Sequence, residues 1–576
     1  MYRKLYYLFL TVALLCGVAC SSDGGDENPT PGPGGSTGGA VTEINGTKIL
    51  DGNDLIGLIS DAATGKGIAG VPVSDGYSFT TTDANGVYQF KANRYCRYVF
   101  YTTPSTHKVA LDAASKLPLF YSTSTIIRGQ QNRNDFKLEP LAAVEDNFTL
   151  IAIGDPQCKS DSDVNRWKNE TIPDIKSTLM GAQSTGKWTN AYAVTLGDIT
   201  FDNTVQWDPM KKSMSNMQVG AGYLPIFNCM GNHDHDAKQT NTYTAQTNYI
   251  ERFGPVDYSF NRGKAHIVVM DNVVCTTTNG STWDYAAGYS QQQYNWLKAD
   301  LDLIENKADK IVFLCCHIPF RGGGNDPSGA NVNKDKHYAE VLELLTQFHE
   351  AHIMIGHTHY PENYVHTKYV CKNGKPIYEH VHGAACGGWW ASNLNVDGAP
   401  MGYSIYEIKG NTVDTWVAKP TAQSENYQMR VYNGNDTYTG SKNYSYTWTG
   451  GGTGGSSNIK TNGNANMADC FIAEIWNDDA TYWKVEFVQN GSATAMKRIT
   501  SLADMCVTSF FFNECGKNTT TWNKACKHTW YIKAPSGNPA TEQNWVVRAT
   551  QTIPGSGKTN VYEASGFHSG YAGFKN

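Results

Sequence analysis

Five short motifs in the middle of the chain carry side chains that bind divalent metal ions. In chain order they are Gly154-Asp155-Pro156-Gln157, Gly197-Asp198, Gly231-Asn232-His233-Asp234, a single His317, and Gly356-His357-Thr358-His359. Aspartate and asparagine oxygens and imidazole nitrogens are the hard and borderline ligands that suit manganese, iron and zinc. The set therefore predicts a pair of divalent metal ions, whose identity the ligand types leave open.

Each motif falls at or just after a short apolar run. The runs cover residues 149–153, 191–196, 224–230, 310–316 and 351–355. Short apolar runs bounded by Gly or Pro are typical of buried strands. Because an α/β sheet places its active site at the ends of its strands, we expect the five motifs to meet at such ends.

Further elements surround these runs. Apolar residues recur at helical spacing within 164–179, 290–304 and 338–348, and Ser290 is a candidate helix cap. Four more strands are predicted at 265–271, 376–381, 402–408 and 412–417, which would complete two sheets.

The ordered motifs resemble those of the calcineurin-like metallophosphoesterases over residues 146–420. The resemblance implies an α/β (α+β) core in which a two-sheet β-sandwich is flanked by helices. It also implies a metal-dependent phosphoric ester hydrolase with two divalent metal ions (Mn, Fe or Zn). A hydroxide that bridges the metals would attack phosphate monoesters or diesters directly, without a phosphoenzyme.

The resemblance assigns roles to individual side chains. Asp198 is expected to bridge both metals, His233 to protonate the leaving oxygen or stabilise phosphoryl charge, and Asp234 to orient His233. Asp202, His235 and Asp236 are expected to be supporting or loop residues. The remaining ligands each bind one metal: Asp155, Gln157 and His359 the first, and Asn232, His317 and His357 the second.

Gln157 departs from the family pattern, because most members have a histidine at this position. Its neutral carbonyl oxygen is a poorer ligand for transition metals than an imidazole nitrogen. This departure supports an alternative, in which the protein is a cell-surface binding or scaffold lipoprotein with a degenerate phosphoesterase domain. In one form of this alternative the protein binds glycans. The other retained motif residues argue against that alternative.

Three residues are weaker candidates for substrate binding. Arg321 follows His317 by four residues and could pair with a phosphate oxygen, although a surface arginine is equally compatible with the pattern. Trp389 and Trp390 follow the last motif and could stack on an organic group of the substrate. Packing under a loop is the alternative for both tryptophans.

The 576 residues are enough for several domains, and the net charge of −6 gives no basic bias toward nucleic acid. Residues 41–141 resemble a transthyretin-like or Ig-like β-sandwich, so an all-β N-terminal domain is expected. Residues 421–576 are rich in strand patterns and predict an all-β C-terminal domain. The sequence predicts no oligomeric state.

The N-terminus has the features of an export signal. Residues 1–20 combine a positive start with an apolar stretch too short to span a membrane, and Gly17-Val18-Ala19-Cys20 resembles a lipobox. Residues 21–40 read as a flexible tether. We expect export and a lipid anchor on Cys20 in the bacterial cell envelope (outer membrane, periplasmic or surface-facing). An ordinary secretory signal with a chance cysteine is the alternative.

Twelve of the 14 cysteines follow Cys20. Three of them, Cys229, Cys315 and Cys316, lie in apolar strand runs and are expected to be buried thiols. Cys506, Cys515 and Cys526 lie close together in a β-rich region, where an oxidising compartment would permit a disulfide.

Overall fold

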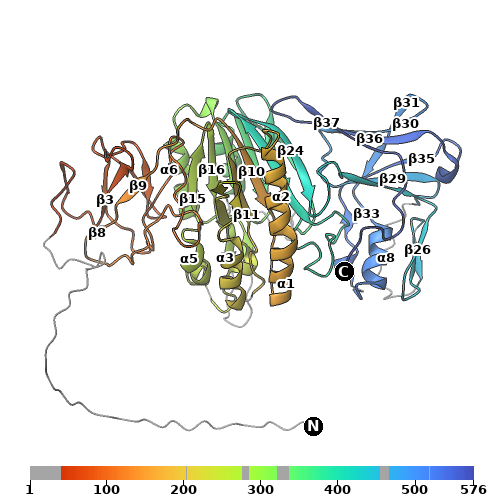
Figure 1. The fold of residues 1–576 in the computed structure, drawn as a ribbon, viewed down its shortest axis with the longest axis horizontal. Coiled ribbons are helices and arrows are strands. Elements are labelled where there is room, and N and C mark those ends of the chain that lie inside the picture. Colours follow the sequence, from red (N-terminus) through yellow and green to blue (C-terminus); the bar gives the residue numbers. More distant parts are fainter. Residues whose placement is uncertain are drawn as a thin grey trace, which may run out of the picture. The chain divides into compact units, whose positions relative to one another are not determined.

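The computed structural model describes residues 40–202, 204–239, 241–275, 285–320, 337–449, 451–453, 466–517 and 519–576. The predicted signal, nearly all of the tether, Cys20 and Arg321 lie outside the described residues. Residues Thr42–Asn576 form one compact unit (Figure 1). Within the described parts of the chain, no helix is both long and apolar enough to cross a membrane.

The core contains the two sheets that the sequence predicts. The first has the order β14-β11-β10-β23-β24, in which β10, β11 and β14 run parallel. The second has the order β15-β16-β19-β20-β22-β21. Their bounds are β10 (Asn147–Ile153), β11 (Ala191–Leu196), β14 (Ile226–Cys229), β15 (Tyr258–Arg262), β16 (Ala265–Val269), β19 (Ile311–Cys315), β20 (Glu350–Ile355), β21 (Tyr364–Val370), β22 (Pro376–Val381), β23 (Gly402–Lys409) and β24 (Thr412–Pro420).

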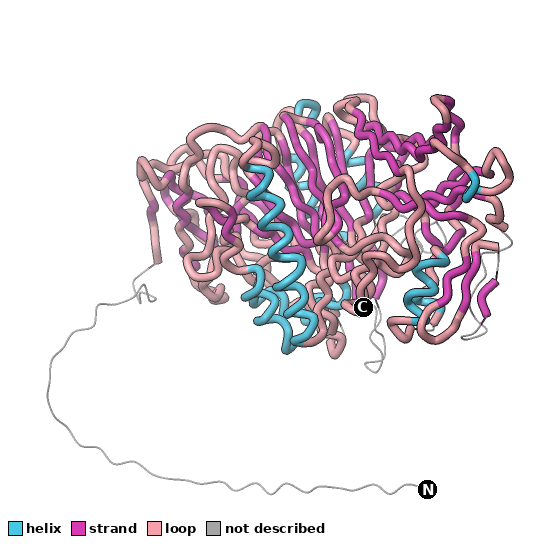
Figure 2. Tube along the Cα trace, turned by 45° about the vertical axis from the view of Figure 1, so that its right-hand side comes forward, coloured by secondary structure: helices cyan, strands magenta, loops and turns pink. Residues whose placement is uncertain are grey.

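Alternation along β10 explains why the sheets form a sandwich. Leu150 and Ala152 belong to a cluster with residues of the second sheet, whereas Ile151 and Ile153 belong to another cluster with helical residues. Successive side chains of a strand point to opposite faces, so a strand that is apolar throughout is covered on both sides. The expected two-sheet sandwich flanked by helices is confirmed (Figures 1 and 2).

Helices cover the outer faces of both sheets. The predicted helix over 164–179 is present as two α-helices joined by a π-helical segment at Trp167–Thr171. Ser290 caps its helix, as expected. The helices against the first sheet are α1 (Asp161–Arg166), α2 (Ile172–Gln183), α3 (Trp207–Met214) and α5 (Thr247–Phe253). The helices against the second sheet are α6 (Gln291–Asp302) and α7 (Tyr338–Leu345).

The described elements of residues 42–141 are all strands. Three small sheets form this N-terminal domain: β1-β2, β6-β3-β8 with β9 beside β3, and β5-β4-β7. The Trp296 indole of α6 donates to the Ser74 hydroxyl at 3.0 Å, which ties the domain to the core. The bounds are β1 (Glu43–Ile44), β2 (Thr47–Lys48), β3 (Leu55–Asp61), β4 (Pro72–Ser74), β5 (Phe79–Thr81), β6 (Val87–Phe90), β7 (Phe100–Tyr101), β8 (Asn132–Arg133) and β9 (Phe136–Leu138).

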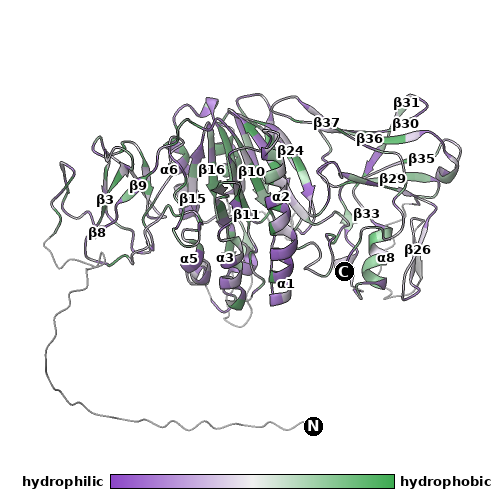
Figure 3. Ribbon diagram, viewed as in Figure 1, coloured by the Kyte–Doolittle hydropathy of each residue, from purple (hydrophilic) through white to green (hydrophobic). Residues whose placement is uncertain are grey.

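The C-terminal region is strand-rich, as predicted, and it also contains a helix that the sequence pattern did not indicate. Helix α8 (Met505–Asn513) begins after its cap Asp504, and every residue in it is buried. Because it is buried on all sides and mostly apolar (Figure 3), it lacks the polar face that would distinguish an amphipathic helix from a strand. The main strands are β25 (Met429–Asn433), β29 (Cys470–Ile475), β35 (Thr529–Lys533) and β32 (Lys497–Ile499) in one sheet, and β31 (Ser492–Ala495), β30 (Trp483–Gln489), β36 (Trp545–Thr552) and β37 (Thr559–Ala564) in another.

The disulfide prediction is wrong. All twelve described cysteines are free, including Cys506, Cys515 and Cys526. The Cys506 sulfur contacts the Gly570 carbonyl oxygen, whereas the Cys526 sulfur faces His528, so proximity in sequence does not bring the sulfurs together. The expected buried thiols at 229, 315 and 316 are confirmed.

Candidate metal centre and active site

The five motifs follow the carboxyl ends of five core strands. They extend from β10, β11 and β14 in the first sheet and from β19 and β20 in the second. Parallel strands bring their carboxyl ends to one edge of a sheet. The motif side chains consequently meet over this edge of the sandwich.

Backbone conformation at the motifs is unusual. Asp155, Gln157, Asp198, His357 and His359 all have left-handed backbone, with φ angles between 40° and 72°. Such a conformation costs about 1–3 kcal/mol for each non-glycine residue, so surrounding contacts must maintain it. The backbone amide of Gln157 donates to the backbone carbonyl of Asp198 at 2.7 Å. The backbone amide of His357 donates to the Asp155 carboxylate at 2.9 Å.

Motif glycines allow side chains of the centre to approach the backbone closely. A Cβ atom on Gly231 would lie 2.3 Å from Asp198 Oδ1, and one on Gly356 would lie 2.7 Å from Asp155 Oδ2. A Cβ atom on Gly197 would lie 2.5 Å from His317 Nδ1. These contacts explain why glycine precedes the ligand residues in three of the motifs.

We expect Gly231→Ala to lower kcat/KM for a phosphate ester by about 10²-fold, because the added methyl group displaces the Asp198 carboxylate. Gly222→Ala is the matched control, since a Cβ atom there meets nothing within 4 Å. Steady-state hydrolysis measures the effect, and circular dichroism verifies folding. Activity within twofold of wild type in Gly231→Ala would show that Asp198 tolerates displacement.

One half of the centre is a compact group around the Asn232 side-chain oxygen. That oxygen lies 2.9 Å from both His317 Nε2 and His357 Nδ1, and these two nitrogens are 3.2 Å apart. Asp198 Oδ1 lies 3.3 Å from His317 Nε2. Four ligands at about 2.0–2.1 Å from a tetrahedral metal ion lie about 3.3 Å from one another, so this group fits such an ion.

The His317 tautomer also suits metal binding. His317 Nδ1 donates a hydrogen bond to the Leu196 carbonyl at 2.8 Å, which directs Nε2 toward Asn232 and Asp198. Outer hydrogen bonds of this kind orient histidine ligands. The Asn272 side chain adds support, since its oxygen accepts from the backbone amides of His317 and Ile318.

The other half of the centre contains Asp155, Asp198 and His359, whose ligand atoms lie within 4.8 Å of one another. All three are buried. The Gln157 amide nitrogen donates to Asp198 Oδ2 at 3.0 Å, and its carbonyl oxygen is buried without a hydrogen-bond partner. An orphaned buried oxygen on a side chain that contacts Asp198 fits a divalent cation held by this group.

Electrostatics at the centre indicate that positive charge is needed. Burial and the neighbouring Asp198 charge raise the pKa of Asp155 to about 8. Burial opposes ionisation of Asp198 as well, but the charges of His317 and His233 hold its pKa below the ordinary value. Burial would lower the pKa of His317, yet Asp198 and Asp155 raise it to about 9. A divalent cation would stabilise both carboxylates in their ionised form.

His233 lies at the rim of the centre and is partly exposed. Its backbone amide donates to Asp198 Oδ1 at 2.8 Å, and its ring stacks on Phe201 at 4.2 Å between centroids. Its Nδ1 lies 2.9 Å from Asp202 Oδ1. Burial lowers the pKa of His233, but the charges of Asp198 and Asp202 raise it by more than burial lowers it, so the net shift of the pKa is upward.

The structure places the Asp234 carboxylate against backbone amides. Its carboxylate accepts from the backbone amides of Gly231, Ile199 and Thr200, so it fixes two motif loops to each other. Asp202, expected only as a supporting or loop residue, forms a hydrogen bond with the His233 ring. Of the other two supporting candidates, His235 is buried against Asp271, and Asp236 accepts from the amide of Lys238.

We expect Asp202→Asn to lower kcat by about 10- to 100-fold, because the amide no longer holds the His233 ring as a carboxylate does. Metal content should stay at the wild-type level, since Asp202 contacts His233 and none of the proposed ligands. Parallel measurement of kcat and bound metal checks this. An unchanged kcat would show that Asp202 does not position His233 for catalysis.

The two candidate tryptophans have different surroundings. The Trp390 indole is buried and donates to the Pro156 carbonyl at 2.9 Å, so it supports the first motif. Trp389 is half-buried between His359 and Trp522 of the C-terminal region, with ring centroids 4.8 and 5.3 Å away. The sequence around Trp522 does not indicate this contact, because Trp389 and Trp522 lie 133 positions apart.

Three family models match this chain: "N terminal of Calcineurin-like phosphoesterase" over residues 56–141, "Calcineurin-like phosphoesterase" over 148–361, and "C terminal of Calcineurin-like phosphoesterase" over 379–554. A search of curated proteins gave no match.

Two solved structures show remote similarity. Purple acid phosphatase PPD1 from yellow lupin (Lupinus luteus) seeds is 12% identical with a TM-score of 0.33, over 58% of this chain and 55% of the lupin chain. NAD nucleotidase (NadN) of Haemophilus influenzae is 11% identical with a TM-score of 0.26, over 48% and 49%. Since the three family models together span the three regions of the fold, this chain belongs to the calcineurin-like phosphoesterases.

Proposed function

We propose that this phosphoesterase hydrolyses phosphate monoesters or diesters with two divalent metal ions. The observation that carries the proposal is the convergence of six ligand-type side chains into two adjoining groups that share Asp198. Two metal ions held there would supply positive charge for the phosphoryl oxygens and an activated water molecule. Manganese, iron and zinc all suit this donor set.

The chain's own residues would then position and protonate the substrate. His233 Nδ1 faces Asp202, which leaves Nε2 to give a proton to the departing oxygen. Phe201 stacks on the ring and limits its rotation. Gln157, with its buried free carbonyl oxygen, would be a weak additional ligand on the side of Asp155 and His359.

Hydrolysis assays on a protein that begins at Thr42 test the proposal. The substrates are p-nitrophenyl phosphate and bis-p-nitrophenyl phosphate, each with added manganese, zinc or iron. Metal-dependent turnover of either ester is the expected result, and the ratio of the two rates gives the preference for monoester or diester. Folded protein that turns over neither ester with any of the metals would contradict the proposal.

We also propose that the protein is exported and anchored through a lipid on Cys20, a proposal supported by the lipobox-like residues alone. Cys20→Ala should move the protein from the membrane fraction to the soluble fraction of the cell envelope. Membrane association that survives this substitution would contradict the anchor.

A further inference from the structure

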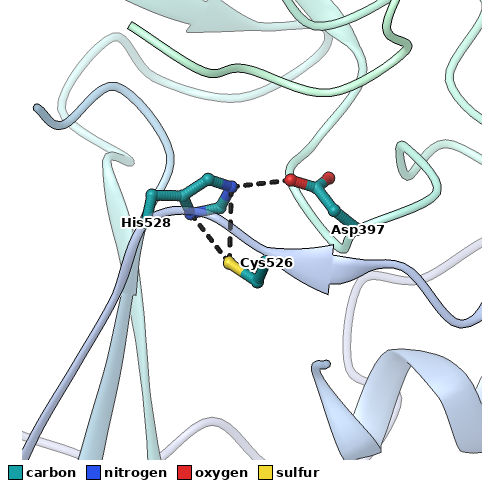
Figure 4. Close-up of side chains that lie close together, drawn as sticks. All are labelled: Asp397, Cys526 and His528. Carbon is teal, nitrogen blue, oxygen red and sulfur yellow. Dashed lines mark hydrogen bonds and ion pairs between the residues drawn. The ribbon is translucent and has the colours of Figure 1, made fainter. Parts of the chain in front are cut away.

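A second group of metal-ligand side chains lies outside the catalytic centre (Figure 4). Asp397, Cys526 and His528 are 1%, 0% and 2% exposed. Asp397 lies in the core loop between β22 and β23, whereas Cys526 ends strand β34 (Ala525–Cys526) of the C-terminal region. The group therefore joins two parts of the fold that are far apart in sequence.

The side chains of this group face one another. His528 Nε2 lies 2.8 Å from Asp397 Oδ2, and the Cys526 sulfur lies 3.1 Å from His528 Nδ1 and 3.5 Å from Nε2. Glu474 of β29, which is 2% exposed, lies beside this group of three, since its Oε1 is 3.6 Å from the Cys526 sulfur. A thiol, an imidazole and two carboxylates are common zinc ligands.

Negative charge is in excess around these four residues. Arg430 is paired with Glu474 at 2.7 Å and lies 3.9 Å from Asp504, and it also donates to the Gly398 carbonyl next to Asp397. One guanidinium thus faces the buried carboxylates of Glu474 and Asp504, while the buried Asp397 carboxylate adds a third negative charge nearby. Buried carboxylates in such excess are stabilised by a cation.

Hydrogen bonding alone does not explain the position of the Cys526 sulfur relative to the His528 ring. At similar distances from both ring nitrogens, the Cys526 sulfur lies against the face of the imidazole and off the lone-pair axis of either nitrogen. Complete burial also denies a substrate access to the thiol, so a Cys-His-Asp nucleophile is excluded.

We propose that Asp397, Glu474, Cys526 and His528 bind a structural zinc ion. On binding, the Cys526 thiol loses its proton to solvent and the thiolate bonds to zinc. Zinc bonds of about 2.3 Å to sulfur and about 2.0 Å to nitrogen require the Cys526 and His528 side chains to rotate from their present positions. Because this set has a thiolate ligand, it favours zinc over magnesium or calcium.

The ion would fasten the C-terminal region to a loop that leads to the catalytic centre. Asn395, two residues before Asp397, accepts from the amide of Ala384 at 3.0 Å. Ala384 in turn pairs with Gly154, the residue before Asp155. The proposed site is thus linked to the first catalytic motif through the Asn395 side chain and the backbone pairing of Ala384 with Gly154.

Cobalt substitution tests the site separately from the catalytic centre. A thiolate-to-cobalt charge-transfer absorption reports a sulfur ligand, and the proposed catalytic ligands contain none. We expect this absorption in the full chain and its loss in Cys526→Ser, together with one equivalent less zinc by elemental analysis. Cys386→Ser is the control, because Cys386 is the cysteine that lies 4.0 Å from the proposed catalytic ligand His359. This variant should keep the cobalt-thiolate absorption.

The isosteric Asp397→Asn variant tests the same site with little disturbance of packing. We expect its zinc affinity to fall at least tenfold in a chelator competition, with the cobalt-thiolate absorption weakened at limiting cobalt. The proposal is overturned if folded wild type gives no thiolate absorption, if the absorption survives in Cys526→Ser, or if Asp397→Asn retains wild-type zinc affinity.

Discussion

Asp198→Asn is expected to lower kcat/KM for p-nitrophenyl phosphate by about 10³-fold, equivalent to ~4 kcal/mol of transition-state stabilisation. Asp198 is the residue that both halves of the centre share. Its Oδ1 lies 3.3 Å from His317 Nε2, and its Oδ2 accepts from Gln157 at 3.0 Å. Asparagine keeps the size of the side chain but replaces one ligand oxygen with an amide nitrogen that cannot bind a metal.

Metal content separates this effect from a change in folding. Asp198→Asn should bind less metal than wild type, as measured by elemental analysis after gel filtration. Asp236→Asn is the matched control, because Asp236 lies in the neighbouring loop and accepts from the Lys238 amide. Wild-type kcat/KM and metal content in Asp198→Asn would contradict the shared-ligand role.

His233→Ala is expected to lower kcat by about 10²- to 10⁴-fold, the usual contribution of a positioned general acid. The loss should be larger for phenyl phosphate than for p-nitrophenyl phosphate, because phenolate is the more basic leaving group and needs the proton more. Metal content should stay close to wild type, since His233 contributes only its backbone amide to Asp198.

The two substrates provide the internal control for His233. An equal loss for both esters would assign the imidazole to phosphoryl charge and not to the leaving oxygen. An unchanged kcat with either ester would remove His233 from catalysis altogether.

Much of the architecture could be predicted because sequence pattern and burial agree along each core strand. The apolar run 149–153 forms most of β10, and its alternate residues face either the helices or the opposite sheet. The motifs directly follow such strands, so their convergence follows from parallel pairing alone. Their roles as metal ligands stay predictions.

Other features depend on tertiary contacts that local sequence does not reveal. Asp234 is adjacent to His233 in sequence, yet three backbone amides hold its carboxylate, and Asp202 reaches the ring from another loop. Left-handed backbone at Asp155 and Asp198 costs free energy locally and persists only because of long-range contacts. Tertiary contacts also decide the positions of Cys506, Cys515 and Cys526, which are close in sequence but do not form a disulfide.

The central claim is that this phosphoesterase holds two metal ions on either side of Asp198. Anomalous diffraction from crystals grown with manganese tests it most directly, because the signal locates each ion. We predict two peaks that flank the Asp198 carboxylate, about 3.5–4 Å apart. A single peak, or none, in crystals of active protein would contradict the account.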